Sequence, residues 1–466
     1  MKADVAWRPR VGLVTVRFTL YDAQMGSDFA ERMRAHAARS AEILGRFADV
    51  MAPPLIESEA DAAVAARQLA SERLDAVVFA PTMVAPPSFA DLALASVDAP
   101  LVIWNAPAID RLPDDYRQDE ATVHSTTVGS VMFGNVRVRR GREFQVVTAG
   151  HDDPVRLGTL ERTVRAVAVA GSLRGSTFLR VGDTIPGYLD VEADDAALAR
   201  LGVREVRLPL GEWEARVRAA DAARVDVLDR DVRLRWAGDP GPCASGSARI
   251  AVALSSALDE HGAAGGAVNC HGAWFRESTE VGLPACLAVA IETDRGRPIA
   301  CTGDQPTAIA LTLARRLTGA ALYCECYVPE RATGLVLVAA GGEGDPAWAE
   351  PADRVTLEAN DHYPGLLGEG TSIAFGLRTG PATILSLSPT DDGWVLAWAT
   401  GAVVESRSSA MRGPNGMFRF DSGVGEEAMS RWIRSGATHH NALAPGRLDV
   451  EVPALAAALG IRQHRV

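Results

Sequence analysis

The chain has almost no lysine: Lys2 is the only one among 466 residues. Schiff-base catalysis, pyridoxal-phosphate attachment and phosphate-loop nucleotide binding each need a lysine in the interior of a domain. The sequence also lacks a G-x-G-x-x-G at a strand–helix junction and a G-x-S-x-G. Dinucleotide binding and serine hydrolysis therefore have no local support either.

Cysteines are few and widely spaced. None stands in a C-x-x-C spacing, which argues against a zinc ribbon, and their scatter argues against a disulfide framework. We therefore expect most of them to be reduced and packed in the interior. They are Cys243, Cys270, Cys286, Cys301, Cys324 and Cys326.

The sequence has neither an excess of basic residues nor a long apolar run. Its net charge is −12 and its acidic residues are dispersed, so nucleic acid is a poor candidate partner. Apolar stretches such as Leu335–Ala340 are far shorter than the roughly 20 residues that span a bilayer. Met1–Arg10 has no long apolar signal core. We expect a cytoplasmic protein that binds no membrane.

Length and composition predict several globular domains. At roughly 100–200 residues per domain the chain holds two to four of them, of which three is our central expectation. We place boundaries near residues 155 and 326, which gives an N-terminal α/β domain (1–155), a central α/β domain (156–326) and a β-rich C-terminal domain (327–466). The predicted fold class is α/β: two doubly wound, parallel-sheet (Rossmann-like) domains, then the β-rich domain.

Strand-like and helix-like segments alternate up to about residue 326. Val11–Val16 is typical of a buried strand, and Ser27 is a candidate N-cap for a helix to about Phe47. This alternation implies parallel sheets, whose ligands usually bind beyond the carboxyl ends of the strands. Further strands are expected at Asp75–Ala80, Leu101–Asn105, Thr177–Val181, Val203–Leu208, Gly266–Asn269, Pro298–Cys301 and Ala321–Cys324.

Two segments depart from this alternation of strands and helices. His124–Asp153 is predicted to consist of polar, glycine-marked turns. Beyond residue 327, short β-rich runs dominate between Gly, Pro and Asp turns, as at Ala382–Leu387 and Met417–Phe420. Trp394 and Trp398 share one face of such a run and are expected in the core.

Two places in the sequence are the main candidates for chemistry. His439 and His440 follow a predicted helix in a polar loop, where an imidazole pair either binds a metal or substrate or simply lies on the surface. Asp304 follows the strand at Pro298–Cys301, where open-sheet enzymes bind ligands. It can equally be the N-cap of the helix beginning near Pro306, and both roles can hold together.

Four weaker candidates stand near these. His271 and Glu325 each end a predicted strand and would face the same edge of the sheet. Glu280 could supply a second oxygen ligand, although a lone acid such as Glu280, or Glu277 beside it, is more often a solvated side chain. Arg17, after the first strand, is either a substrate contact or part of a surface loop.

Together these segments resemble the L-fucose isomerase / L-arabinose isomerase superfamily of metal-dependent aldose–ketose isomerases, over nearly the whole chain. The most specific part is S-G-A-T-H-H-N-A-L-A-P-G at 435–446, similar to the family's G-x-x-H-H element. The other parts are residues 282–304, ending in C-T-G-D, residues 173–190, and G-P-A-T at 380–383.

The resemblance implies a ligand set and a chemistry. The fucose-type metal ligands fall on Glu280, Asp304 and His440, with His271, His439 and Arg17 as weaker substrate contacts. A divalent cation, Mn²⁺ or else Co²⁺ or Mg²⁺, would bind two sugar oxygens while Glu280 and Asp304 move protons through an enediol. A homo-oligomer, a trimer or hexamer, is implied as well.

The sequence departs from the arabinose-type pattern at two places. Thr302 stands where that branch has a glutamate, and the histidine expected within Val336–Asp345 is missing. The expected function is therefore a metal-dependent aldose–ketose isomerase, with two alternatives. One is a sugar-binding or regulatory relative without turnover, and the other is a metal-dependent lyase or tailoring enzyme on a different polyol.

Overall fold

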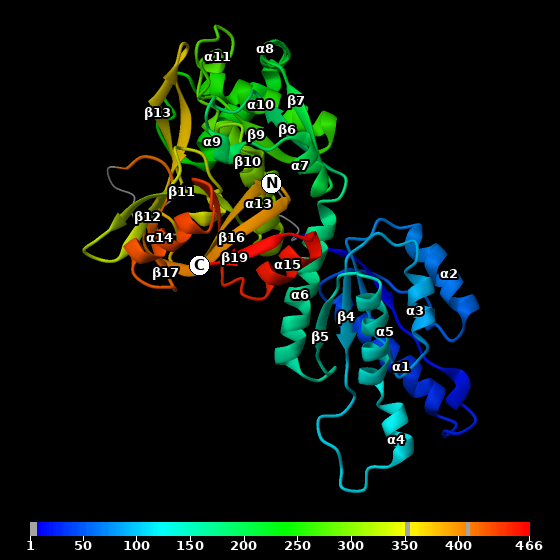
Figure 1. Cartoon of the computed structure of the whole chain (residues 1–466). Coiled ribbons are helices and arrows are strands. Elements are labelled where there is room, and N and C mark those ends of the chain that lie inside the picture. The colour runs from blue at the N-terminus through cyan, green and yellow to red at the C-terminus, as the bar shows by residue number, and fades with distance from the viewer. Residues whose placement is uncertain (1–6, 350–354, 407–410) are drawn as a thin grey trace. The chain divides into compact units, whose positions relative to one another are not determined.

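The computed structural model describes residues 7–349, 355–406 and 411–466, so Lys2 lies outside the described residues. The chain divides into two compact units (Figure 1). One consists of Ala6–Ser172 with Asp449–Ile461, and the other contains Leu173–Leu448 with Arg462–Val466. Within the described ranges, none of the helices combines the length and apolar character needed to cross a bilayer. The boundary placed near residue 155 coincides with the start of a long helix, and the one near 326 falls inside a strand.

The first unit is built on a five-stranded parallel sheet in the order β2-β1-β3-β4-β5. Its central strands are buried and mostly apolar, apart from the exposed Arg10 at the start of β1, as expected for a sheet covered by helices. The strands are β1 (Arg10–Val14), β2 (Asp49–Met51), β3 (Ala76–Phe79), β4 (Leu101–Asn105) and β5 (Gln145–Thr148).

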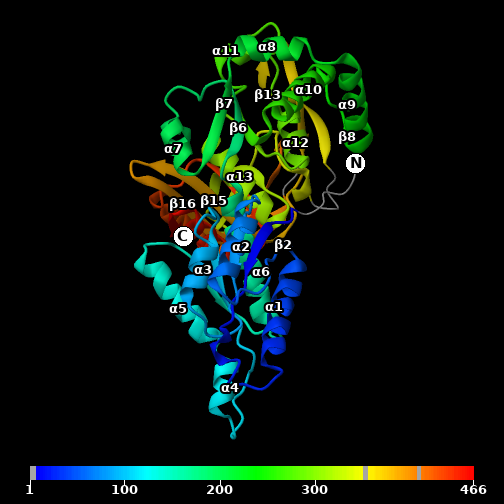
Figure 2. The same cartoon turned by 90° about the vertical axis from the view of Figure 1, so that its right-hand side faces the viewer.

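Helices surround this sheet (Figure 2). They are α1 (Phe29–Gly45), α2 (Glu59–Ala70), α3 (Pro87–Ala93), α4 (Gln118–Val123), α5 (Thr126–Arg139), α6 (Pro154–Ser172) and α15 (Glu451–Leu459). The last of these returns from the far end of the sequence to pack on α6, where Arg162 donates two hydrogen bonds to Glu451, at 2.6 and 2.7 Å.

The prediction of turns at His124–Asp153 is wrong, because α5 and β5 occupy most of that segment. Its β-branched and glycine residues favour a helix only weakly. Packing outweighs this low propensity. Phe133 is fully buried, and Gly129 lies so close to the main chain that a Cβ there would be 2.5 Å from the carbonyl oxygen of Met83.

The second unit begins with a four-stranded parallel sheet in the order β10-β9-β6-β7. Its strands are β6 (Ser176–Val181), β7 (Val203–Leu208), β9 (Ala263–Val268) and β10 (Ile299–Ala300). The helices of this region are α7 (Asp195–Arg200), α8 (Leu210–Arg218), α9 (Ala222–Arg235), α10 (Ala244–His261), α11 (Ala273–Arg276), α12 (Cys286–Asp294) and α13 (Gln305–Thr318).

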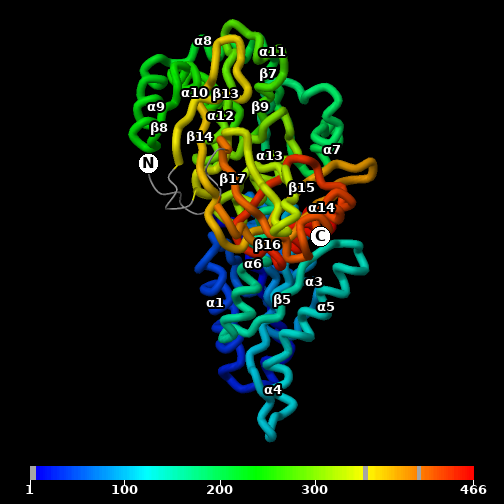
Figure 3. The backbone as a smooth tube through the Cα atoms, turned by 90° about the vertical axis from the view of Figure 1, so that its left-hand side faces the viewer, coloured from blue at the N-terminus to red at the C-terminus, as the bar shows by residue number. Residues whose placement is uncertain are grey.

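An antiparallel sheet follows and closes on itself (Figure 3). The neighbours run β15-β18-β11-β12-β17-β16, and β16 pairs back onto β15, while β19 (Arg462–Arg465) adds to β16 in parallel. Trp394 and Trp398 are buried in it, as expected. The strands of the ring are β11 (Leu322–Glu330), β12 (Leu335–Ala339), β15 (Gly380–Thr390), β16 (Gly393–Ser406), β17 (Asn415–Phe420) and β18 (His440–Pro445), with α14 (Gly425–Arg434) between the last two.

A third, smaller sheet joins distant parts of the second unit. The hairpin β13 (Thr356–Gly365) and β14 (Gly368–Ala374) pairs with β8 (Ala237–Gly238). The structure thus confirms a mixed α/β chain whose parallel sheets precede a closed antiparallel sheet. One continuous apolar core extends from the parallel sheet of the second unit into the antiparallel one.

Candidate functional site

The site lies at the carboxyl ends of β9 and β10, which are neighbours in the parallel sheet. Asn269, Cys270 and His271 follow β9, and the amide of Asn269 shapes this turn. Its Oδ1 accepts hydrogen bonds from the main-chain N–H groups of His271, at 3.2 Å, and of Gly272, at 3.1 Å. Asn269 is fully buried, so the turn is fixed from within.

The turn after β10 holds Cys301, Thr302, Gly303 and Asp304. Thr302 has φ 55°, a left-handed conformation that costs a branched residue about 1 kcal/mol or more. Asp304 then caps α13: its Oδ1 accepts from Thr307 N at 2.8 Å and its Oδ2 from Thr307 Oγ1 at 2.7 Å. The N-cap interpretation of Asp304 is therefore confirmed.

The Asp304 carboxylate also contacts His440, the first residue of β18. His440 Nδ1 lies 2.8 Å from Asp304 Oδ2, and both side chains are almost completely buried, with exposures of 2% and 0%. A carboxylate only accepts, so Nδ1 donates this hydrogen bond, and in the neutral form of the ring Nε2 is the nitrogen with the lone pair. Asp304 thus holds the imidazole in one orientation and one tautomer.

Two carboxyl groups share these surroundings. Glu325 of β11 stands directly opposite His440 in the antiparallel pairing, and its Oε1 is 4.0 Å from His440 Nε2. Such opposite residues project from the same face of the sheet. Glu343, beyond β12, is 3% exposed. Burial raises the pKa of Glu343, and the negative charge of Glu325 raises it further.

Two thiols and an imidazole gather at the same strand ends. The Sγ atoms of Cys270 and Cys301 and a ring nitrogen of His271 all lie within 4.8 Å of one another. A hydrogen bond from Cys301 lowers the pKa of the Cys270 thiol, and the same bond, with burial, raises the pKa of the Cys301 thiol. Burial lowers the pKa of His271.

The sequence interpretation missed this cluster, because the cysteines were treated only as packed side chains. A signal was present nonetheless. Cys270 follows one predicted strand and Cys301 ends another of the same parallel sheet, and the carboxyl ends of parallel strands meet at one edge.

Aromatic rings border the cluster and the histidine. The ring of Tyr363 lies edge-on to His271, with 4.6 Å between centroids, and the ring of Tyr323 is 4.9 Å from that of His440. Burial raises the pKa of both tyrosines, so their hydroxyl groups stay protonated and can donate hydrogen bonds.

His439 is placed differently from its neighbour. The two rings are 3.7 Å apart, but the side chain of His439 is 38% exposed, and its Nδ1 is 2.6 Å from Asp190 Oδ2. Burial opposes ionisation of Asp190, yet the hydrogen bonds from His439 outweigh it and lower the pKa of Asp190.

The other predicted residues, Glu280 and Arg17, each take part in ion pairs. The contacts of Glu280 are an ion pair with Arg218, at 3.3 Å, and a main-chain hydrogen bond to Ser278, and its side chain is 40% exposed. Arg17 belongs to the first unit, where its buried guanidinium pairs with Asp22 and Glu57, each at 2.7 Å. Arg17 is thus a structural ion-pair residue.

The expected manganese ligands are consequently not assembled as a set. Asp304 and His440 meet, but Asp304 Oδ1 and Oδ2 already accept three hydrogen bonds and His440 Nδ1 is one of the donors. Glu280 faces Arg218 instead. As placed, these three residues do not fit a hard divalent cation, which takes oxygen-rich sites with free ligand atoms.

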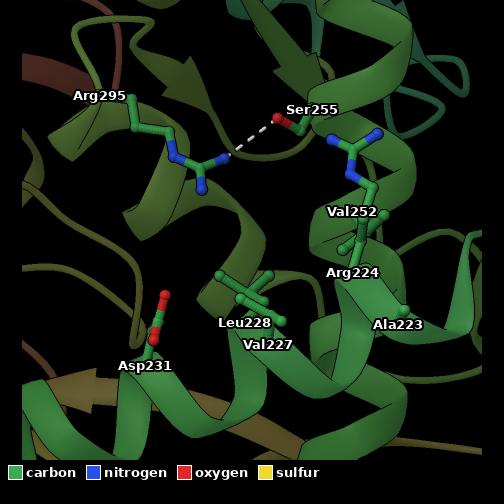
Figure 4. A pocket seen from close by; sticks show the side chains of 8 residues that line it. All are labelled: Ala223, Arg224, Val227, Leu228, Asp231, Val252, Ser255 and Arg295. Atoms are coloured by element: carbon green, nitrogen blue, oxygen red, sulfur yellow. Dashed lines mark hydrogen bonds between the residues drawn. The ribbon is translucent and has the colours of Figure 1, made fainter.

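Two surface pockets in the structure do not include the residues above. A pocket of about 310 Å³ between α9 and α10 is lined by apolar side chains and by Arg224, Asp231 and Arg295 (Figure 4). Arg295 donates a hydrogen bond to the hydroxyl of Ser255, which also lines the pocket. Another, of about 450 Å³, lies in the first unit, beside α1. Neither pocket has a cluster of titratable groups like that around His440.

Comparisons with known proteins add little. No family model matches the chain, and no curated protein matches it. Among solved structures, it is similar to a periplasmic solute-binding protein of an ABC transporter from Actinobacillus succinogenes with bound D-allose, at 13% identity over 66% of this chain and 92% of that chain, with a TM-score of 0.17. It is also similar to a carbohydrate transporter from Acidothermus cellulolyticus in complex with myo-inositol, at 14% identity over 67% of this chain and 88% of that chain, with a TM-score of 0.16. At such scores the likeness carries no argument.

Proposed function

We propose that the second unit is an aldose–ketose isomerase that acts on a free sugar or sugar-like polyol. The observation that carries the proposal is the buried Asp304–His440 pair, whose Nε2 faces the carboxylate of Glu325. The resemblance to the fucose and arabinose isomerases supplies the substrate class, and the geometry supports proton transfer.

The reaction moves one proton between neighbouring carbons. His440 Nε2 would take the proton from C2 of an aldose, while the C–H electron pair forms the C1=C2 bond of an enediol. The carbonyl oxygen would receive a proton from Glu343, whose raised pKa keeps it in the acid form to higher pH than usual. Return of the His440 proton to C1, and loss of the C2 hydroxyl proton to Glu343, gives the ketose. Both groups end in their starting states.

The manganese requirement implied by the resemblance stays a prediction. Because Glu280 is not placed with Asp304 and His440, no step above passes through that cation. Trimeric or hexameric assembly and a cytoplasmic location stay predictions too. We also propose that both parallel sheets belong to the doubly wound class, for which the strand order β2-β1-β3-β4-β5 is the supporting observation.

Deuterium uptake in D₂O, at C2 of an aldose or at C1 of a ketose, tests the proposal, because exchange reports enediol formation even where equilibrium hides net conversion. The purified chain is incubated with a panel of aldoses and ketoses, with and without Mn²⁺. We expect exchange on at least one sugar and loss of exchange in His440→Asn. Saturable sugar binding without any exchange would overturn the isomerase and favour the sugar-binding alternative, and carbon–carbon cleavage products would favour the lyase.

A further inference from the structure

We propose that Cys270, His271 and Cys301 bind a zinc ion. Among the residues that the structure describes, this is the one group of three potential ligands whose donor atoms converge, with all separations within 4.8 Å. Bound to one tetrahedral zinc ion, two sulfurs and a nitrogen lie about 3.5–4 Å apart, as follows from usual Zn–S and Zn–N lengths. Small side-chain rotations would bring the three atoms to these positions.

The donor chemistry selects the metal. Thiolate sulfur and imidazole nitrogen favour zinc over the harder Mn²⁺ and Mg²⁺, which prefer carboxylate and carbonyl oxygen. The expected Glu280, Asp304 and His440 set would have favoured the harder ions. The three residues that the structure does bring together therefore point to a different ion as well as a different place.

The main chain holds the cluster in position. β9 and β10 pair in parallel through Gly266–Ile299 and Ala267–Ala300, so the turns that carry Cys270 and Cys301 lie side by side. Both thiols are buried, at 7% and 5% exposure. His271 is half-buried, and its main-chain N–H is held by Asn269.

Three protein ligands leave the fourth position of a tetrahedral zinc ion open, as in catalytic rather than structural zinc sites. Glu343, like Asp304, is a buried carboxyl group of this region. Its Oε2 accepts a hydrogen bond from the Sγ of Cys286, at 3.7 Å. The same Sγ accepts a hydrogen bond from Asn360 Nδ2, at 3.3 Å. Water or a substrate oxygen would complete the coordination, which leaves Glu343 available as the proton donor of the proposed reaction.

The inference goes beyond the proposed isomerase, because zinc binding can be measured without any sugar. The full chain is stripped with a chelator under reducing conditions and titrated with ZnCl₂ or with CoCl₂ alone. Bound metal is counted by atomic absorption after dialysis. We expect one equivalent of zinc per chain and, with cobalt, the near-ultraviolet charge-transfer absorption of a Co²⁺–thiolate bond.

Three variants decide the ligands. Cys270→Ser and Cys301→Ser should each weaken zinc binding at least tenfold and reduce the thiolate absorption, whereas His271→Asn should weaken binding and retain the absorption. Cys243→Ser is the matched control, since the Cys243 thiol contacts Leu367 O instead. Circular dichroism identifies any variant that fails to fold. If a serine variant fails to fold, His271→Asn still tests the site, because it changes only a half-buried side chain.

Several results would overturn the inference: no stoichiometric zinc, a cobalt spectrum without thiolate absorption, equal loss of binding in Cys243→Ser, or a Cys270–Cys301 disulfide that persists under reducing conditions. The two proposals also fail separately. Zinc binding without deuterium exchange on any sugar contradicts the isomerase alone, and exchange by a chain that takes up no zinc contradicts the zinc site alone.

Discussion

His440 and Asp304 are 136 residues apart in the sequence, yet His440 Nδ1 lies 2.8 Å from Asp304 Oδ2. The contact joins a turn at the end of the parallel sheet to the first residue of β18 in the antiparallel sheet. Asp304 is at once the cap of α13 and the partner of the imidazole, so the start of the helix fixes the orientation of His440. A carboxylate in this role selects the tautomer and stabilises the imidazolium that forms when Nε2 takes a proton.

Replacement of Asp304 by Asn should slow deuterium exchange by roughly 10²–10⁴-fold. An amide can cap a helix about as well as a carboxylate, but it cannot stabilise an imidazolium. Asp194→Asn is the matched control, because Asp194 caps α7 through Ala197 N and has no contact with the site. Two quantities are measured for each variant: kcat for exchange, and the unfolding midpoint, which shows whether the fold is retained. Full activity in Asp304→Asn would contradict the assigned pair.

The two adjacent histidines should differ sharply. His440→Asn removes the buried base and should abolish exchange. His439→Asn removes a partly exposed ring that pairs with Asp190, so we expect a raised KM with kcat changed less than tenfold. Steady-state kinetics on each variant separate the two effects. An equal loss of kcat in both variants would contradict the expected difference between the two histidines.

Glu280→Gln distinguishes the placement seen in the structure from the role implied by the resemblance. If Glu280 only pairs with Arg218 at the surface, the variant should retain exchange within about twofold and lose less than 1 kcal/mol of stability, as surface ion pairs do. A metal ligand and proton carrier would instead be indispensable. Exchange rates with and without Mn²⁺ provide the comparison, and a loss of 10²-fold or more would restore Glu280 to the site.

The sequence predicts best what local patterns determine. The buried strands β1, β3 and β4 follow from apolar runs between helical segments, and the cap of α13 follows from Asp304 standing just before Pro306. Helix α5 could not be predicted in this way, since its formation depends on how closely Gly129 approaches the main chain at Met83.

The site was predictable only in part, for a related reason. Asp304, His271 and Glu325 were singled out because each was expected at a strand end of the predicted sheets. Glu325 lies instead within β11 of the antiparallel sheet. The partner of a strand-end residue depends on sheet pairing across long stretches of sequence, as between Glu325 and His440. Glu280 is the converse case: an interval in the sequence singled it out, but such an interval does not fix where a loop carboxylate points, and in the structure it pairs with Arg218.

The first unit should lose stability as the pH falls from 7 to 5. Burial, together with the nearby His151, whose ring centroid is 4.3 Å away, lowers the pKa of His36 to about 4. Between about pH 4 and 6.5 the unfolded chain therefore binds a proton that the folded chain does not, so the free energy of unfolding decreases with decreasing pH. For this one group the loss is at most about 2 kcal/mol between pH 7 and 5.

Urea unfolding at pH 5, 6 and 7 measures this dependence, with hydrogen exchange of α1 amides as the readout for the first unit. His36→Gln should flatten the pH dependence, because the side chain no longer titrates. His464→Gln is the control, since His464 is exposed on β19. Identical slopes for His36→Gln and the unmodified chain would show that His36 does not stay neutral in the folded protein.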